Sequence, residues 1–238
     1  MNILLKALSV ALFPLAAMAQ GLDGSDQLIV VTSKSWDDIQ GTAQRYERHG
    51  QTFRKFEAPF AVVLGKNGMG WGKGLLDIEQ PEGPVKQEGD GKTPAGMFKL
   101  GTAFGYAPSA DTRLPYLALT PTIECVDDSQ STRYNELVDG AVVDKGWNSS
   151  ERMRRSDELY RQGIVIQHNT PATPAAGSCI FFHIWRGPSA PTRGCTAMDP
   201  ANIAQLFDWL DPGKSPVLVQ LPEAQYEQLR EHWKLPKR

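Results

Sequence analysis

A short apolar run in the last third of the chain places the strongest constraint on its fold. In the seven residues 179–185 (CIFFHIW), a β-strand would carry Cys, Phe, His and Trp on one face and Ile, Phe and Ile on the other. Because both faces are then apolar, this strand should be buried on both sides within a layered domain. The 22 glycines and 17 prolines indicate many turns, which favours a mainly β fold over a helical bundle.

Other segments predict the remaining elements of such a fold. Strands are expected at residues 27–31, 60–64, 97–100, 163–169 and 216–221, with a turn at 65–68 leading into Met69 and Trp71. Asp199-Pro200 is a good helix start, and the apolar residues that follow repeat at helical spacing up to a stop at 211–213. A helical turn is expected within 35–50, a polar helix from a capping box at Asn148–Glu151 to about Tyr160, and a short surface helix plus tail at 222–238. The long irregular stretch 104–143 is interpreted as a substrate-side insertion.

His183 and Cys195 form the candidate catalytic pair. His183 ends the apolar run, and a Pro- and Gly-rich loop leads from it to Gly194-Cys195, where glycine permits a tight turn. A thiolate is the reactive form of cysteine, and a neighbouring histidine can generate it near neutral pH. We expect His183 to act as general base and then general acid, with backbone N–H groups of Gly194 and Cys195 forming an oxyanion hole. A buried histidine beside a structural cysteine is the alternative that spacing alone leaves open.

A family resemblance favours the catalytic interpretation. His183 followed by a loop and Thr192-Arg193-Gly194-Cys195 resembles the YkuD-type L,D-transpeptidase signature, as does the segment 89–101 (GDGKTPAGMFKLG). The resemblance implies a YkuD-like β-sandwich or mixed sheet with a few short helices and long loops. It also implies attack on a peptidoglycan stem peptide, acylation by carbapenems, and no cofactor. Two features depart from the pattern: the spacer after His183 is short, and Ala197 stands where an arginine is common.

Three further residues are candidates for substrate contact. Thr192 could hydrogen-bond the turn or the substrate, and Arg193 could meet a stem-peptide carboxylate. Their alternatives are a turn hydroxyl and a solvated cation. His168, at the end of the 163–169 strand, is a second candidate for a base or a substrate-positioning group, with a hydrogen-bonded structural histidine as its alternative.

Several other chemistries lack their usual sequence signals. Gly91-Lys92-Thr93 imitates the end of a phosphate-binding loop, but Lys86 stands where that motif needs glycine. The glycines of 65–74 do not fit a dinucleotide fingerprint, and no nucleophile elbow or Ser-x-x-Lys indicates a serine enzyme. The cysteine and histidine spacings do not indicate a metal site. The net charge of −2 argues against nucleic acid or an anionic membrane as the main partner.

The amino-terminal segment and the cysteines bear on where the protein works. Residues 1–19 read as a signal peptide with an Ala-Met-Ala cleavage site, so we expect export to the periplasm and no stable membrane span after its removal. A catalytic domain is then expected at 20–221. The economical pairing of three cysteines joins Cys125 to Cys179 and leaves Cys195 free; three free thiols are the alternative.

Three functional hypotheses follow from the residues and the resemblance. The first is a peptidoglycan L,D-transpeptidase that forms cross-links in cell wall biogenesis and cell shape, with an unusual donor or linkage position left open by Ala197. The second is a cell wall hydrolase, either a carboxypeptidase or an endopeptidase, with the same Cys/His pair. The third is a wall-binding module that keeps the fold without catalysis.

Overall fold

The computed structural model describes residues 22–76 and 82–238, so the signal peptide predicted over residues 1–19 lies outside the described residues. The strands are β1 (Gln27–Ser33), β2 (Gln40–His49), β3 (Thr52–Val63), β4 (Met69–Trp71), β5 (Thr93–Gly105), β6 (Tyr116–Ala118), β7 (Ile123–Val126), β8 (Leu137–Asp139), β9 (Ser150–Arg152), β10 (Gln162–Ile166), β11 (Phe181–Ile184), β12 (Thr196–Met198) and β13 (Val217–Pro222). The helices are α1 (Pro200–Trp209), a short 3-10 turn at Pro212–Lys214, and α2 (Glu223–Leu229).

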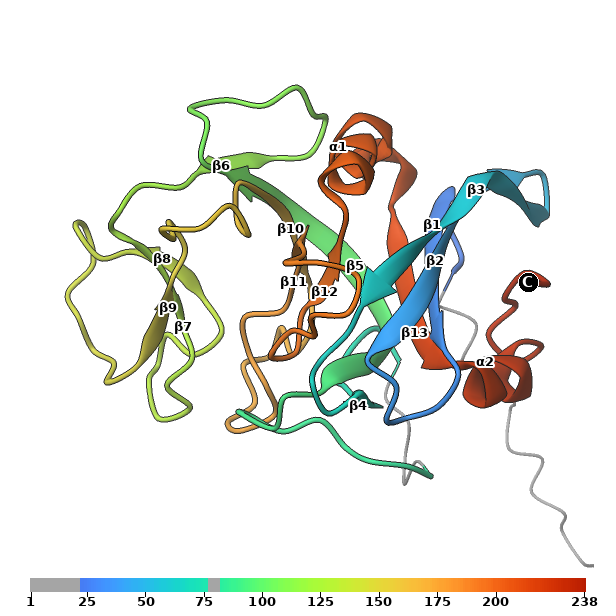
Figure 1. Ribbon diagram of the computed structural model, residues 1–238, viewed down its shortest axis with the longest axis horizontal. Helices are drawn as coiled ribbons and strands as arrows, with labels where there is room; N and C mark the ends of the chain where they lie inside the picture. The colour runs from blue at the N-terminus through green and yellow to red at the C-terminus, as the bar shows by residue number, and fades with distance from the viewer. Residues whose placement is uncertain (1–21, 77–81) are drawn as a thin grey trace, which may run out of the picture.

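A ten-stranded mixed sheet forms the body of the molecule (Figure 1). Its order is β10-β11-β12-β3-β2-β1-β13-β5-β4, with β6 attached to β5. A further antiparallel pairing between β10 and β5 closes the sheet on itself. Parallel pairs, such as β11 with β12 and β1 with β13, lie among antiparallel ones. The mainly β, mixed-sheet fold expected from the sequence is therefore confirmed.

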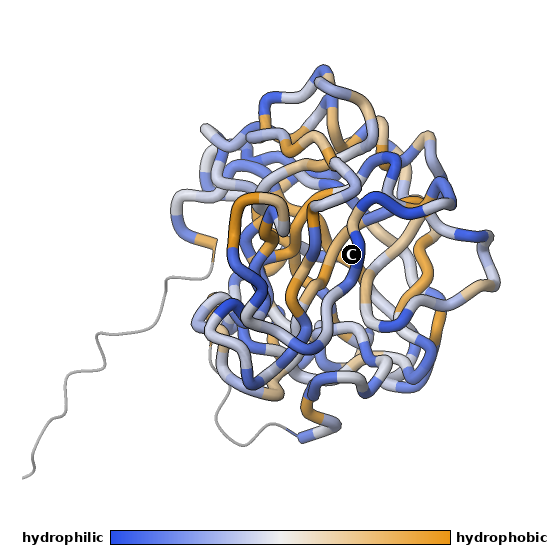
Figure 2. The backbone as a smooth tube through the Cα atoms, turned by 90° about the vertical axis from the view of Figure 1, so that its left-hand side faces the viewer, coloured by the Kyte–Doolittle hydropathy of each residue, from blue (hydrophilic) through white to orange (hydrophobic). Residues whose placement is uncertain are grey.

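The strand that contains His183 separates two apolar clusters, as its alternating pattern predicts. Phe182 and Ile184 belong to the main core, which includes the buried face of α1. Phe181 faces a second cluster that holds all three cysteines and Tyr160. Figure 2 shows the hydrophobic segments gathered inside the molecule and the hydrophilic ones mostly at its outer turns. Both faces of β11 are thus buried, and the residues on one of them approach Cys195.

Helix α1 begins and packs as predicted. The Asp199 side chain accepts a hydrogen bond from the Ala201 N–H, and Pro200 occupies the first turn, where its missing N–H costs nothing. The buried residues of the helix are Ile203, Leu206, Phe207 and Trp209, and its C-cap residue Leu210 is buried as well. α2 also forms, and Trp233 and Leu235 in the following tail are buried against the main core. In the part of the chain described, no helix is long and apolar enough to cross a membrane.

Two predicted helical segments are strands instead. The segment expected to hold a helical turn before Gly50 is β2, which pairs with β1 on one side and β3 on the other. The helix predicted from the capping box after Asn148 is also wrong, because Ser150–Arg152 pairs with β7. The Ser150 hydroxyl bonds to the Glu124 carboxylate rather than to a helix terminus. In both segments, pairing with neighbouring strands outweighs the local helix signals.

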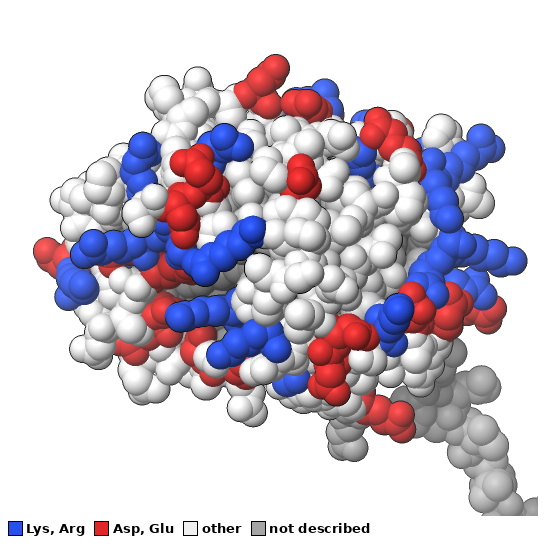
Figure 3. Space-filling model, in the orientation of Figure 1, with Lys and Arg blue, Asp and Glu red and all other residues white. Residues whose placement is uncertain are grey.

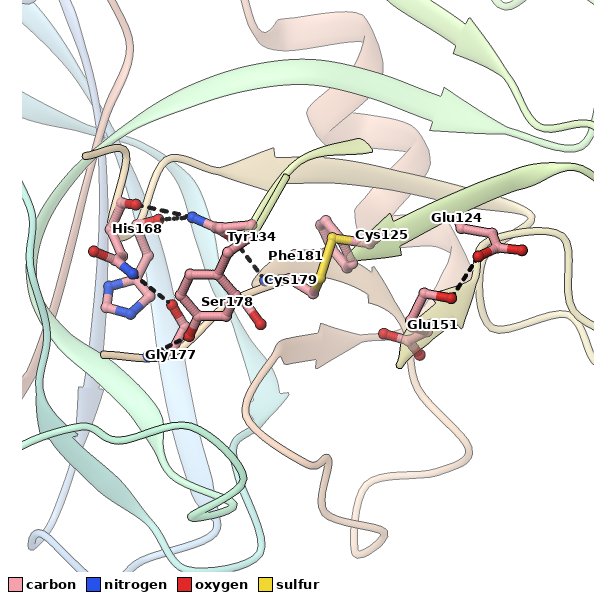
Figure 4. Close-up of a disulfide and its surroundings, with 12 residues drawn as sticks. Glu124, Cys125, Tyr134, Glu151, His168, Gly177, Ser178, Cys179 and Phe181 are labelled. Carbon is pink, nitrogen blue, oxygen red and sulfur yellow. Dashed lines mark hydrogen bonds between the residues drawn. A yellow bond between two sulfur atoms is a disulfide. The ribbon is translucent and has the colours of Figure 1, made fainter. Parts of the chain in front are cut away.

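A small lobe occupies part of the stretch that the sequence left irregular. It is a three-stranded sheet of order β8-β7-β9, which lies to one side of the main sheet in Figure 1. A disulfide joins Cys125 on β7 to Cys179 just before β11, which confirms the pairing predicted for these cysteines (Figure 4). The Asn135 side chain also accepts a hydrogen bond from the Cys179 N–H. The lobe is therefore fastened directly to the strand that carries His183.

Candidate active site

Two neighbouring parallel strands bring His183 and Cys195 to one cleft. His183 lies on β11 and pairs in register with Ala197 on β12, and Cys195 immediately precedes β12. The loop between them is held by backbone hydrogen bonds between Thr192 and both Leu64 and Lys66. Both side chains line a cleft of about 890 Å³, and Cys195 is the free cysteine of the described chain. The sheet, rather than the loop alone, sets their relative position.

The sulfur of Cys195 is buried but has polar neighbours. The Phe181 N–H donates to Sγ at 3.4 Å, and the thiol donates to the Cys179 carbonyl at 3.5 Å. Burial is the main cause that raises the pKa of Cys195 to about 12, and the carboxylate of Glu151 raises it further. The hydrogen bond from the Phe181 N–H lowers the pKa and so acts in the opposite direction. At neutral pH the resting group is a thiol.

His183 is neutral for the same reason. Burial lowers its pKa to about 4. Its Nδ1 lies 2.7 Å from the Ile184 carbonyl, which can only accept, so Nδ1 carries the proton. Nε2 is then the basic nitrogen. The resting pair is therefore a thiol and a neutral imidazole, which is the combination that a general base needs before proton transfer.

The turn before the cysteine is shaped by Thr192 and Gly194. The Thr192 hydroxyl donates to the Cys195 carbonyl at 2.6 Å and accepts from the Gly194 N–H at 3.0 Å. Gly194 has φ of 151°, and a Cβ there would lie 3.1 Å from the Lys92 carbonyl oxygen. Thr192 thus acts as a turn hydroxyl in this structure. The Gly194 N–H is therefore already bonded to the Thr192 hydroxyl. For Gly194 and Cys195 to form the expected oxyanion hole, that hydrogen bond must first break.

Basic side chains surround the mouth of the cleft. Figure 3 shows Lys and Arg on both sides of a hollow between the small lobe and the body. The basic residues that line the cleft are Lys66, Lys86, Arg155, Arg186 and Arg193, and the acidic ones are Glu88, Asp127 and Glu151. Arg193 is exposed at this lining, consistent with either a substrate contact or a solvated cation. The cleft suits a ligand with both carboxylates and amines.

His168 is not brought to this cleft. β10 ends at Ile166, two residues before it, and the buried imidazole lines a separate cavity of about 200 Å³. Its Nε2 lies 3.1 Å from the Ala176 carbonyl, and its ring packs edge-on against Phe98. Figure 4 shows His168 on the opposite side of the disulfide from Glu151. Its surroundings are those of a buried structural histidine.

Sequence reasoning missed two residues that stand beside the pair. Tyr160 is buried with its ring edge-on to that of His183 at a centroid distance of 5.2 Å. Its hydroxyl donates to Glu151 Oε1 at 2.8 Å. Glu151 lies on β9, where the Asn-Ser-Ser-Glu pattern predicted a helix start, and the pairing of β9 with β7 accompanies its place in the cleft lining.

No group of three or more potential metal ligands gathers anywhere in residues 22–76 and 82–238.

Comparisons of the chain with known proteins gave one family match and two similar solved structures. A search among curated protein sequences found no match. Two solved structures of the helical cell shape determining protein Pgp2 from Campylobacter jejuni, one of them a mutant, are similar at 16% identity, with TM-scores of 0.41 and 0.43. They cover 82% and 83% of this chain, which spans only 48% and 47% of theirs. The model of the YkuD family, described as the L,D-transpeptidase catalytic domain, matches residues 38–219. The match takes in both strands of the cleft and most of the chain, which therefore belongs to the YkuD family of L,D-transpeptidase catalytic domains.

Proposed function

We propose that this protein is an exported peptidoglycan L,D-transpeptidase that forms cross-links through a Cys195 acyl-enzyme. The observation that carries the proposal is that His183 on β11 and Cys195, directly before the adjacent strand β12, line one cleft in a chain of this family. The catalytic domain spans 20–221. The segment 222–238 packs on it without lining the cleft.

The geometry supports a two-step acyl transfer. In the first step, the Sγ proton passes to His183 Nε2, and the thiolate attacks the diaminopimelate carbonyl of a donor stem tetrapeptide. The C–N bond to the terminal D-Ala breaks, D-Ala takes the proton from the imidazolium, and a thioester remains on Cys195. In the second step, an amine of a neighbouring stem loses a proton to His183, attacks the thioester and regenerates the thiol.

Backbone N–H groups near Cys195 are proposed to stabilise the charge that develops on the attacked oxygen. The Gly194 N–H exchanges its bond to Thr192 for one to the oxyanion, together with the N–H of Cys195. Ala197 is fully buried and pairs with both His183 and Val63. A cation for the donor carboxylate therefore comes from the cleft mouth, where Arg193 is the nearest to the nucleophile in sequence.

The test is the product formed from purified tetrapeptide muropeptides. We expect cross-linked dimers, with D-Ala released in equal amount, and no products from Cys195→Ala. His183→Ala should be nearly inactive, whereas His49→Ala, at an exposed position on β2, is the matched control and should match the parent protein. Shortened monomers without dimers would instead establish a hydrolase. Absence of any thioester with muropeptide or carbapenem, measured by intact mass, would leave only a binding module.

A further inference from the structure

We propose that Arg155 is the specificity-determining residue that binds the terminal carboxylate of the donor stem peptide, and that Asp157 positions its guanidinium for this contact. The inference rests on the proposed function and deepens it, because it identifies which basic residue of the cleft meets the donor. It follows from the hydrogen bonds of Arg155, its place beside His183 and the surroundings of the other cleft cations.

Asp157 and the Tyr160 ring hold the Arg155 side chain in one orientation. The Nε and Nη2 groups of Arg155 donate to the two carboxylate oxygens of Asp157 at 2.8 and 2.9 Å. The Arg155 guanidinium also lies over the Tyr160 ring, 5.2 Å from its centroid. The hydrogen bond from Arg155 lowers the pKa of Asp157, which therefore stays a carboxylate near neutral pH. A guanidinium held in this way loses little further freedom when it binds a ligand.

The bonds to Asp157 leave part of the guanidinium free to bind a second carboxylate. Asp157 engages two of its N–H groups, and Glu151 accepts a third, from Nη1, at a longer 3.3 Å. One N–H on Nη1 and one on Nη2 remain without an acceptor among residues 22–76 and 82–238. Arg155 lines the cleft, and 28% of its side chain is exposed. A carboxylate in the cleft can therefore accept these N–H groups without displacing Asp157.

The position of Arg155 relative to the reacting groups suits the last residue of the donor. The Tyr160 ring beneath the guanidinium meets the His183 ring edge-on at a centroid distance of 5.2 Å, so one aromatic ring separates the cation from the proposed general base. In the proposed first step, the D-Ala carboxylate lies one residue beyond the attacked carbonyl, a span of at most about 3.6 Å. An N–H···O bond adds about 3 Å to that span. Arg155 is thus within reach of this carboxylate while the attacked carbonyl faces Cys195.

The other basic residues of the cleft are less suited to this contact. Lys86 is ion-paired with Asp90 at 2.5 Å, and its side chain is only 3% exposed. Lys66, Arg186 and Arg193 are exposed, where water weakens an ion pair and a free side chain must be immobilised to form one. They add to an attractive field, since basic residues outnumber acidic ones in the cleft lining, but they offer no oriented donors.

Two matched donors test the inference. One is the tetrapeptide muropeptide with its free D-Ala carboxylate, and the other is the same molecule with that carboxylate converted to a carboxamide. We measure kcat and KM from the release of D-Ala or its amide, and we expect the parent protein to prefer the free acid, mainly through a lower KM. The different leaving amines of the two donors affect every variant alike, so this difference cancels when variants are compared.

Arg155→Met keeps the apolar stem over Tyr160 and removes the N–H donors. For the free acid, kcat/KM should fall about tenfold to a hundredfold, mainly through KM, because charge-assisted hydrogen bonds are lost. For the amide, it should fall less than about threefold. Arg155→Lys keeps the charge without the fork of donors and should retain part of the preference for the acid.

Further variants separate carboxylate binding from other roles. Asp157→Asn loosens the hold on the guanidinium, so KM for the acid should rise about threefold while kcat for the amide stays unchanged. Arg193→Ala should keep the preference for the acid. Arg54→Ala, at an exposed position on β3 outside the cleft lining, is the matched control and should behave as the parent protein does.

Equal losses with acid and amide in both Arg155 variants would show that Arg155 only supports the fold, and would overturn the inference. Disappearance of the preference in Arg193→Ala would overturn it as well. So would an Arg155-dependent preference for the side-chain carboxylate of diaminopimelate, tested with a donor amidated only there. Parent protein that releases product from neither donor would overturn the proposed function, whereas release without preference for the acid would overturn only this inference.

Discussion

Removal of the Cys125–Cys179 disulfide should cost both stability and activity. The two cysteines are 54 residues apart in sequence, and the chain-entropy relation for a closed loop of that size gives about 4 kcal/mol of stabilisation. For a domain of this size that corresponds to a fall of about 10 °C in the unfolding temperature. The same bridge fixes the Cys179 carbonyl, which accepts the hydrogen bond from the Cys195 thiol. The double variant Cys125→Ala/Cys179→Ala removes the bridge and leaves no new thiol.

Urea unfolding and thioester formation measure the two consequences separately. We expect the free energy of unfolding to fall by about 4 kcal/mol and carbapenem acylation at Cys195 to slow at temperatures where the double variant is still folded. For the unfolding measurement, Cys195→Ala is the matched control, since it removes one sulfur from the same apolar cluster and keeps the bridge. A loss below about 1 kcal/mol in the double variant would refute the view that the bridge fastens the small lobe to β11.

Two further predictions concern the turn and the buried histidines. Gly194→Ala should lower the free energy of unfolding by about 1–3 kcal/mol and reduce thioester formation on Cys195. The reason is that φ of 151° is unfavourable for alanine and that the new Cβ would approach the Lys92 carbonyl. Intact mass measures the acylation, and an unchanged extent would contradict this prediction. His168 and His183 have folded-state pKa values lowered by burial to about 4, against 6.5 in the unfolded chain. Because the unfolded chain then binds more protons, their contribution is fully present above about pH 6.5 and is lost as pH falls towards 4, by about 3 kcal/mol for each histidine. In urea unfolding between pH 7 and 4, His168→Gln should lose less of its free energy of unfolding than the parent protein does.

Local patterns were sufficient for the elements that carry the candidate catalytic pair. The period-two run around His183 and the Asp199-Pro200 helix start each reflect short-range physics, and both appear where expected. The free Cys195 followed from cysteine arithmetic and a family resemblance. These features depend little on distant partners.

Long-range pairing decided what the sequence could not show. β2 is polar along much of its length, and its strand character comes from β1 and β3 on either side. Glu151 fits a helix cap by local pattern, but β7 and the disulfide hold its segment as a strand. His168 continues the alternation of β10, yet the strand ends before it and the side chain turns into a different cavity.

The parallel pairing of β11 and β12 has a consequence for the short connection between them. Backbone hydrogen bonds between two strands keep a spacing of roughly 4.8 Å whatever the length of the segment that joins them. β11 also pairs with β10, and β12 also pairs with β3. The alignment of the His183 imidazole with the Cys195 sulfur therefore depends little on residues 186–191. Relatives with longer crossovers can therefore share the same chemistry, and a peptide tag inserted at Ser189 should leave the reacting atoms aligned.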